Sequence, residues 1–322
     1  MVCASRLLVA LMLCLAAITA PAQTDWPTRP VRIVVGFAPG GTTDISARIL
    51  ADQLTKAFNQ TFLVDNRAGA SGMIGAAEVA RSAPDGYTFL MGNAGTQAIN
   101  QFIYSKMPYN AQKDFAPVSL VVRVPLVLVV HPSLGVRSLQ ELIDRAKAKP
   151  GSINYGTAGI ATPGHLSTEL LKMLAKIDLV HIPYKGSGPM LQDLLAGQVQ
   201  MAIDLLPPAI PHIRAGKLSA LGVTSAMPVA ELPNVPTIAS VIAGFESDGW
   251  YALMAPAGTS QQIITRISIE IDKILHRSDV VERVKQLGAV PVGGTPAELA
   301  LFIESETVKW REVVKTSGAK AE

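Results

Sequence analysis

Short β-branched runs alternate with segments of helical periodicity along most of the chain. Val31–Val35 predicts a strand, a glycine-rich turn follows at 36–41, and apolar residues recur at helical spacing from Ile45 onward. Further strands are predicted at 62–65, 87–91, 118–122, 126–130, 153–156, 179–182, 201–203, 220–223 and 250–254. Further helices are predicted at 73–81, 139–148, 165–174, 190–196, 263–275 and 297–314. This order of elements predicts an α/β fold with parallel sheets built from strand–helix–strand units.

The length of the chain, 322 residues, favours two domains. A second unit of strands and helices begins near His131. The two units could follow one another as a plain tandem. Alternatively, the chain could leave the first domain near Val130 and rejoin it near Trp250. The alternation of elements does not choose between these arrangements.

The N-terminal segment is typical of a secretory signal peptide. Arg6 is the only charged residue before Asp25, an apolar run covers 7–18, and Ala20–Ala22 supplies small residues for cleavage. The apolar run is too short to span a membrane, which takes ~20 residues. We therefore expect a signal peptide at 1–22, cleavage after Ala22 and a soluble protein in the periplasm.

The mature chain is expected to lack cysteine and to be close to neutral. Cys3 and Cys14 both lie in the signal segment, so neither a disulfide nor a thiol nucleophile remains. A lipid anchor on Cys14 is the less favoured alternative, because Leu13 is not the small residue such a site carries. The net charge is +3, and removal of Arg6 leaves +2 (3 − 1). This charge gives no electrostatic argument for binding nucleic acid or an anionic membrane.

The turn between the first predicted strand and helix is the most informative loop. Gly40 and Gly41 lack a Cβ atom, so main chain there can approach a ligand closely. We expect Thr42 or Thr43 to cap the helix, whose free N–H groups and dipole attract an anion. The segment matches neither the P-loop nor the Gly-x-Gly-x-x-Gly pattern. An ordinary turn with a capped helix remains the alternative.

Similar glycine-bearing loops follow other predicted strands. In the second unit, Tyr155–His165 contains three glycines, and Thr162 is expected to be the N-cap residue before Pro163. Two more such loops lie at 66–72 and 92–97. Loops of this type in two separate units predict a cleft that closes on an anion from both sides.

Patterns for catalysis or metal binding are weak. The histidines, at 131, 165, 181, 212 and 276, form no His-x-x-x-His pair, and no Gly-x-Ser-x-Gly motif is present. Asp44 or Asp204 with His165 could form an acid–base pair, but capping and local hydrogen bonding are the favoured explanations for Asp44 and His165. Asp204, at a strand end, could hold a ligand amine or hydroxyl, or could be a turn residue before the prolines that follow.

Three other side chains have open roles. Lys185 and Arg67 could pair with a ligand carboxylate, although lysine is usually solvated and Asp65 is close enough to occupy Arg67. Tyr184 could pack in the core or face the cleft.

A set of short segments occurs in one order along nearly the whole mature chain: Trp26–Val35, Phe37–Asp44, Val64–Ala70, Pro84–Thr88, Asn154–Gly156, Thr162–His165, Pro183–Gly186 and Asp193–Val199. Together they resemble the extracytoplasmic substrate-binding proteins of tripartite tricarboxylate transporters. The resemblance implies a type II periplasmic-binding-protein fold, with two Rossmann-like lobes joined by crossing strands near 126–130 and 250–254. It selects the interrupted arrangement, with lobe 1 at 23–128 and 252–322, lobe 2 at 129–251 and a ligand cleft between them.

The resemblance also implies a function. A small carboxylate is held by main-chain amides and bridging waters, the lobes close by hinge motion, and the ligand passes to a membrane transporter. It implies a monomer that is not an enzyme and needs no cofactor or metal. The candidate ligand-binding residues are Phe37, Ala38, Pro39, Gly40, Gly41, Thr42, Asn93, Gly95, Thr96, Ala158, Gly159, Thr162, His165, Tyr184 and Asp204.

The sequence departs from the family pattern at two places. Family members often carry Ser or Thr where Asn93 and Ala94 stand, and Phe where Ile203 stands. These departures concern the identity of the ligand, which varies among members from citrate-like acids and dicarboxylates to acidic amino acids and aromatic acids. The alternative functions are an exported hydrolase or transferase, and a subunit that presents its ligand to a membrane sensor.

Overall fold

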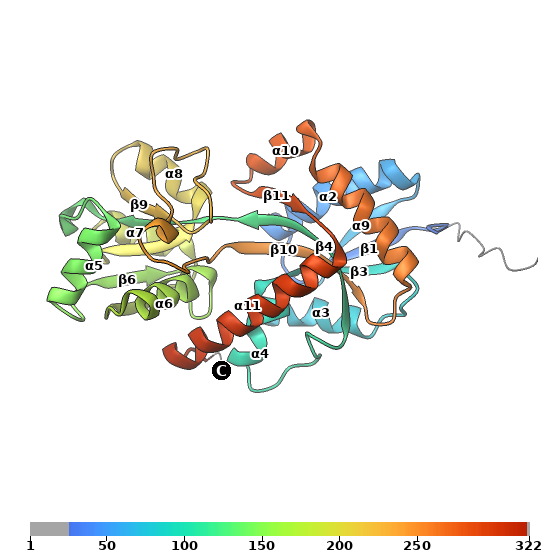
Figure 1. The fold of residues 1–322 in the computed structure, drawn as a ribbon, viewed down its shortest axis with the longest axis horizontal. Helices are drawn as coiled ribbons and strands as arrows, with labels where there is room; N and C mark the ends of the chain where they lie inside the picture. Colours follow the sequence, from blue (N-terminus) through green and yellow to red (C-terminus); the bar gives the residue numbers. More distant parts are fainter. Residues whose placement is uncertain (1–25, 321–322) are drawn as a thin grey trace, which may run out of the picture.

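The computed structural model describes residues 26–320, which form two α/β lobes (Figure 1). Lobe 1 is built on a six-stranded sheet with the strand order β11-β4-β10-β3-β1-β2, and lobe 2 on a five-stranded sheet with the order β7-β6-β8-β5-β9. The strands of lobe 1 are β1 (Val31–Val35), β2 (Phe62–Asn66), β3 (Thr88–Asn93), β4 (Phe115–Val124), β10 (Gly249–Pro256) and β11 (Val290–Gly293). Those of lobe 2 are β5 (Leu126–Val130), β6 (Asn154–Thr157), β7 (Val180–Pro183), β8 (Met201–Leu205) and β9 (Ser219–Val223). The expected signal peptide lies outside the described residues.

Helices flank both sheets. In lobe 1 they are α2 (Thr42–Phe58), α3 (Met73–Ala80), α4 (Asn100–Ile103), α9 (Gln261–Leu275), α10 (Ser278–Lys285) and α11 (Pro296–Ser317). In lobe 2 they are α5 (Leu139–Ala148), α6 (Pro163–Ala175), α7 (Ser187–Leu195) and α8 (Leu206–Arg214). Short 3₁₀ turns lie at Ala70–Gly72, Pro132–Leu134 and Ile238–Ser240, and a π-helical turn at Gly95–Ile99.

The central strands are mostly apolar because both of their faces are covered. In β1, Ile33 joins the core cluster that contains Leu50 of α2 and Ile267 of α9. Val34, which points to the opposite face, joins the cluster that contains Ala76 of α3 and Trp310 of α11. A strand buried on two faces is expected to be rich in β-branched residues, which is the pattern of Val31–Val35 apart from Arg32.

The chain leaves lobe 1 after β4 and returns to it at β10. β5 pairs with β8 and β9 in the second sheet, whereas β10 pairs antiparallel with β3 and β4 in the first. The chain therefore passes from the first sheet to the second between Val124 and Leu126, and it returns to the first sheet between Val223 and Gly249. The two connecting strands run between the lobes in Figure 1. Of the two arrangements that the sequence allows, the structure has the interrupted one.

A hydrogen-bonded cluster ties the two connections together. Leu126 N donates to Thr224 Oγ1 over 2.8 Å, and Thr224 N donates to Leu126 O over 2.9 Å. Thr224 Oγ1 donates to the buried carboxylate of Asp248 over 2.9 Å, just before β10, and Arg123 at the end of β4 pairs with Glu246. Polar side chains thus link the connection between β4 and β5 to the segment that precedes β10.

Helix α11 contacts both lobes. It starts with a capping box between Thr295 and Glu298 in lobe 1, packs on β4, and continues to α6 of lobe 2 (Figure 1). Inside this interface the indole N–H groups of Trp250 and Trp310 both donate to Oε2 of the buried Glu306, each over 2.9 Å.

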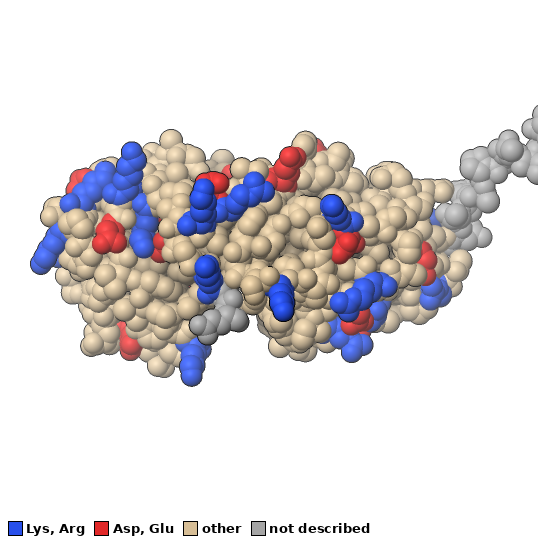
Figure 2. Space-filling view, turned by 90° about the horizontal axis from the view of Figure 1, so that it is seen from below, with Lys and Arg blue, Asp and Glu red and all other residues tan. Residues whose placement is uncertain are grey.

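Charged side chains of both signs are scattered over the face shown in Figure 2, with uncharged surface between them. That face shows no continuous basic stripe of the kind that follows a nucleic-acid backbone. Between residues 26 and 320, no helix combines the length and apolarity needed to cross a bilayer.

Candidate functional site

The residues predicted to bind ligand fall into two groups at the carboxyl ends of parallel strands. The lobe 1 group lies at or after the ends of β1 and β3: Phe37, Ala38, Pro39, Gly40, Gly41, Thr42, Asn93, Gly95 and Thr96. The lobe 2 group lies at or after the ends of β6, β7 and β8: Ala158, Gly159, Thr162, His165, Tyr184 and Asp204. Ligands of open α/β sheets bind at such strand ends.

The loop after β1 is held in shape by Asp44. Its carboxylate accepts hydrogen bonds from Gly40 N at 2.9 Å, Arg48 Nε at 3.0 Å and Asn66 Nδ2 at 2.9 Å. Asn66 Nδ2 also donates to Phe37 O over 3.0 Å. Burial acts to raise the pKa of Asp44, but these hydrogen bonds outweigh it and the pKa is lowered. Asp44 is therefore an ionised anchor for the loop.

The anchored loop presents free main-chain donors. Residues 38–41 are exposed, and α2 begins at Thr42 with Gly41 as N-cap and no side-chain cap. The prediction that Thr42 or Thr43 could cap the helix was wrong, because Gly41 is the N-cap residue and both threonines lie in the first turn, near the hydroxyl of Tyr251 in β10. The first N–H groups of a helix have no partner inside the helix, so they remain available to a ligand.

The loop after β3 lies beside the first loop. Thr96 N donates to Asn93 Oδ1 over 2.9 Å, and Asn93 N donates to Thr96 Oγ1 over 3.0 Å. A Cβ atom added to Gly72 would lie 2.8 Å from Thr96 and 3.0 Å from the ring of Phe37, so both loops converge on this glycine. Thr96 is buried and serves the loop itself, while Asn93 and Gly95 are partly exposed.

In lobe 2, the loop between β6 and α6 repeats this construction. Thr162 is the N-cap residue, as predicted, but its hydroxyl donates to Gly159 O over 2.8 Å and leaves the helix without a side-chain cap. Ala161 N donates to Nδ1 of the buried His165 over 3.0 Å, which fixes the loop to the first turn of α6. Ala158 and Gly159 are partly exposed. The first main-chain N–H groups of α6, like those of α2, therefore have no side-chain cap and remain available to a ligand.

Tyr184 and Asp204 lie at the same edge of lobe 2. Tyr184 donates its hydroxyl to Asp193 over 2.8 Å and its main-chain N–H to Thr157 over 3.0 Å. Asp204 is 5% exposed and accepts a hydrogen bond from Ser187 Oγ over 3.0 Å. Ser187 is the first residue of α7 and was not among the predicted site residues, because the helix was predicted to begin only at Met190.

The two edges face each other. Leu205, which ends β8 of lobe 2, packs against the core cluster of lobe 1. A Cβ atom on Gly288 of lobe 1 would lie 2.7 Å from Pro207 of lobe 2. The carboxyl end of β8 is therefore directed toward lobe 1.

Comparison with known proteins identifies the family. The chain matches the model of the tripartite tricarboxylate transporter family receptor over residues 46–319. The chain belongs to this family. Protein BugT of Bordetella pertussis is 40% identical to the receptor over 315 residues, which cover 97% of this chain and 97% of that protein.

Solved structures of related proteins share the fold. The structure described as R. palustris Rpa4515 with adipate is 40% identical, with a TM-score of 0.76 over 92% of this chain and 99% of that chain. MatC from Rhodopseudomonas palustris with bound malate is 33% identical, with a TM-score of 0.71 over 90% and 100%. The predicted fold class is confirmed: the receptor is a solute-binding protein with the type II periplasmic-binding-protein fold.

The two basic residues that could have paired with a ligand carboxylate give no support for that role. Arg67 pairs with Asp65 over 3.1 Å, as expected, and Lys185 is exposed. Among residues 26–320, no group of three or more His, Cys, Asp or Glu side chains is placed to hold a metal ion.

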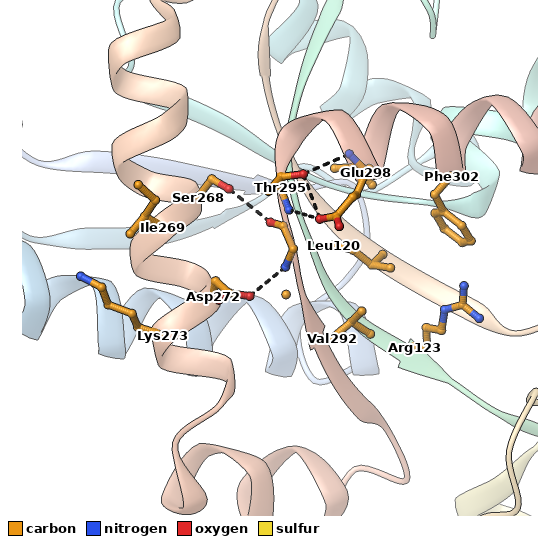
Figure 3. A pocket seen from close by; sticks show the side chains of 13 residues that line it. Leu120, Arg123, Ser268, Ile269, Asp272, Lys273, Val292, Thr295, Glu298 and Phe302 are labelled. Atoms are coloured by element: carbon orange, nitrogen blue, oxygen red, sulfur yellow. Dashed lines mark hydrogen bonds between the residues drawn. The ribbon is translucent and has the colours of Figure 1, made fainter.

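A separate hollow of about 790 Å³ lies between α9, β11 and α11 (Figure 3). Two of the carboxylates beside it bind the main chain of the receptor: Asp272 accepts from Gly294 N over 3.0 Å, and Glu298 accepts from Thr295 N over 2.7 Å. Since these groups already shape the turn into α11, we assign this hollow no ligand.

Beneath the lobe 2 loop, three rings form a stack. His181 lies 4.1 Å from His165 and 4.8 Å from Tyr155, measured between ring centroids, and its Nε2 is 2.7 Å from Thr157 Oγ1. Burial, helped by the neighbouring His165, lowers the pKa of His181 to about 4, and burial lowers the pKa of His165 too. The stack is therefore neutral near pH 7. The parallel pairing of β6 with β7 places Tyr155 opposite His181, a register that no local pattern in the sequence reveals.

This stack predicts a loss of stability in acid. The folded receptor protonates His181 near pH 4, whereas the unfolded chain does so near 6.5. The unfolded chain binds more protons in this range, so the free energy of unfolding should fall as the pH drops from about 6.5 to about 4. His181→Gln should reduce this fall, and urea unfolding at several pH values measures it.

The test uses the difference in the free energy of unfolding between wild type and His181→Gln at each pH. Burial raises the pKa of Asp248 to about 6, so Asp248 contributes with the opposite sign and stabilises the fold as the pH falls. His276→Gln, at the C-terminal end of α9 and outside the stack, is the control and should retain the fall in stability that the stack causes. Identical pH profiles for wild type and His181→Gln would contradict the prediction.

Proposed function

We propose that the protein is a periplasmic receptor that captures a small carboxylate between its two lobes and delivers it to a tripartite tricarboxylate-type membrane transporter. The relatives with adipate and with malate support this class of ligand. We further propose export with cleavage after Ala22, a monomer in solution, and a lobe 2 that starts with β5 and ends before β10; the boundaries expected from the sequence, lobe 1 at 23–128 and 252–322 and lobe 2 at 129–251, would divide these two strands.

One observation carries the proposal. Helices α2 and α6 both start without a side-chain cap, after glycine-bearing loops, at the edges of two lobes that face each other. A carboxylate placed between them would accept hydrogen bonds from main-chain donors on both sides, directly or through water. Neutral donors hold the anion without a buried cation, which suits a receptor that must also release it.

The contacts of the acidic and basic groups favour binding over catalysis. Asp44 is fully engaged by Gly40, Arg48 and Asn66. His165 uses Nδ1 to accept from Ala161, and burial lowers its pKa, so it serves the loop. An exported hydrolase would need one of these groups free to exchange a proton with its substrate.

Isothermal titration calorimetry of the purified mature protein tests the proposal. The panel is succinate, malate, adipate, citrate, aspartate, glutamate and benzoate, with maltose and AMP as non-carboxylate and phosphate controls. At least one acid should bind with a one-to-one stoichiometry. Binding of maltose or AMP in the absence of binding by every acid would overturn the proposal.

The membrane partner and the processing need separate measurements. Affinity capture from membranes of the native host should recover transporter subunits, whereas recovery of a membrane kinase alone would favour a sensory role. Intact mass of the exported protein should match a chain that starts at residue 23.

A further inference from the structure

The carboxylate of Asp204 is buried with one oxygen unpartnered. The residue is 5% exposed; Ser187 Oγ donates to Oδ1 over 3.0 Å, and Oδ2 has no hydrogen-bond partner among the described residues. A buried carboxylate oxygen without a donor is costly, so such an atom indicates a missing partner.

Asp204 lies within the candidate ligand site. β8 runs parallel to β6, so its carboxyl end lies beside the loop that starts at Thr157. The first turn of α6 sits directly on this strand end, because a Cβ atom on Gly164 would lie 2.1 Å from Ile203 O. The next residue, Leu205, packs against lobe 1. Oδ2 is therefore unsatisfied at the edge where the two lobes meet.

No cation among residues 26–320 compensates Asp204. Burial raises its pKa, and the opposing contributions come only from hydrogen bonds of Leu205 and Ser187. The nearby Lys185 is exposed, and burial keeps His165 neutral near pH 7. No described residue supplies a donor to Oδ2, which leaves a bound ligand or an ordered water molecule as its partner.

We propose that Asp204 Oδ2 accepts a hydrogen bond from a hydroxyl or ammonium group on the bound carboxylate. This rests on the proposed function and narrows its ligand class. The helix donors hold the carboxylate, and Asp204 selects acids that carry a hydrogen-bond donor over unsubstituted acids of the same length. A ligand without such a group leaves Oδ2 buried and unpaired. The free-energy cost of this unpaired oxygen disfavours the unsubstituted acid by more than the new hydrogen bond favours the substituted one.

Matched sets of acids test this selection. Succinate, malate and aspartate form one set, and glutarate, 2-hydroxyglutarate and glutamate form another. In at least one set, a substituted acid should bind at least about tenfold more tightly than the unsubstituted one by calorimetry. Asp204→Asn should reduce this ratio severalfold, because the amide oxygen is a neutral and weaker acceptor than the carboxylate. Asp144→Asn, on the exposed face of α5, is the matched control and should keep the wild-type ratio.

The outcomes separate the two proposals. Binding of no acid in either set or in the wider panel overturns the proposed function and this inference together. Acids that bind without preference, or with a preference that Asp204→Asn retains, overturn only the role of Asp204.

A pH series on the wild type keeps the test valid if Asp204→Asn fails to fold. Ionised Asp204 accepts, so the preference for substituted acids should hold or grow from pH 5 to pH 9. The other titratable groups near this edge are His165, His181, Tyr184, Lys185, Asp193, Glu169 and Lys172. The ratio is taken between malate and succinate or between 2-hydroxyglutarate and glutarate, because the two members then carry the same charged groups and the effect of the protein groups on them largely cancels. If instead succinate or glutarate binds best and weakens as the pH rises, a protonated Asp204 donates to the ligand and the inference is wrong.

Discussion

Replacing Gly41 with valine should weaken carboxylate binding by about ten- to hundredfold and leave the fold intact. Gly41 has φ −78° and ψ 166°, which valine also adopts, and a Cβ atom there would meet only Ala38 O, at 4.0 Å. Valine is a poorer N-cap residue than glycine, so we expect a loss of about 1 kcal/mol in the free energy of unfolding. Its branched side chain would cover the free amides of the loop and prevent the ligand from reaching them, and a hydrogen bond to a charged group contributes about 1.5–3 kcal/mol.

Gly36→Val is the contrasting variant in the same loop. A Cβ atom on Gly36 would lie 2.7 Å from the Cα and carbonyl oxygen of Gly72, so this variant should lose stability and binding together. Calorimetric titration with the best acid of the panel, paired with urea unfolding, measures both effects. Wild-type affinity in Gly41→Val, or a loss of stability equal to that of Gly36→Val, would refute the role assigned to Gly41.

Replacing Gly164 with alanine should lower the free energy of unfolding by about 3 kcal/mol. Its Cβ atom would lie 2.1 Å from Ile203 O, far inside van der Waals contact. Ile203 is paired with Leu128 in the sheet of lobe 2, so its carbonyl cannot turn aside as a side chain can. The first turn of α6 would have to move off the strand.

Gly188→Ala is the matched control. Gly188 is the second residue of α7, as Gly164 is of α6, and a Cβ atom there meets nothing within 4 Å. Alanine should leave stability unchanged or raise it by up to about 1 kcal/mol, because it favours the helix. Equal urea midpoints for the two variants would show that α6 is not seated on β8 in solution.

Local patterns predicted most of the secondary structure. β1, β5 and α5 have the predicted bounds, because each has a periodicity that its burial explains. Helix α8 was missed because it contains three prolines. Two of them, Pro207 and Pro208, lie in the first turn, where an N–H group has no intrahelical partner to lose. β11 was missed as well, since it has four residues, of which Pro291 and Gly293 are poor strand formers.

The candidate site was only partly predictable. Glycine-bearing strand exits identified the loops of both lobes, but the residues that hold these loops come from distant parts of the chain. Asn66 reaches Phe37 and Asp44 from β2, and Tyr251 reaches the first turn of α2 from β10. Such contacts depend on strand order and register, which a local pattern does not contain. The unpartnered oxygen of Asp204 likewise becomes evident only once its surroundings are known.

Helix α11 has a consequence for how a loaded receptor could be distinguished from an empty one. It is continuous with lobe 1 but packs on α6, whose first turn carries the lobe 2 part of the site. Any rotation of the lobes that brings the two loops together must therefore slide the flank of α6 along α11. The packing between α6 and α11 would therefore change when ligand binds. A membrane subunit docked over this contact could detect the bound ligand without touching the ligand itself.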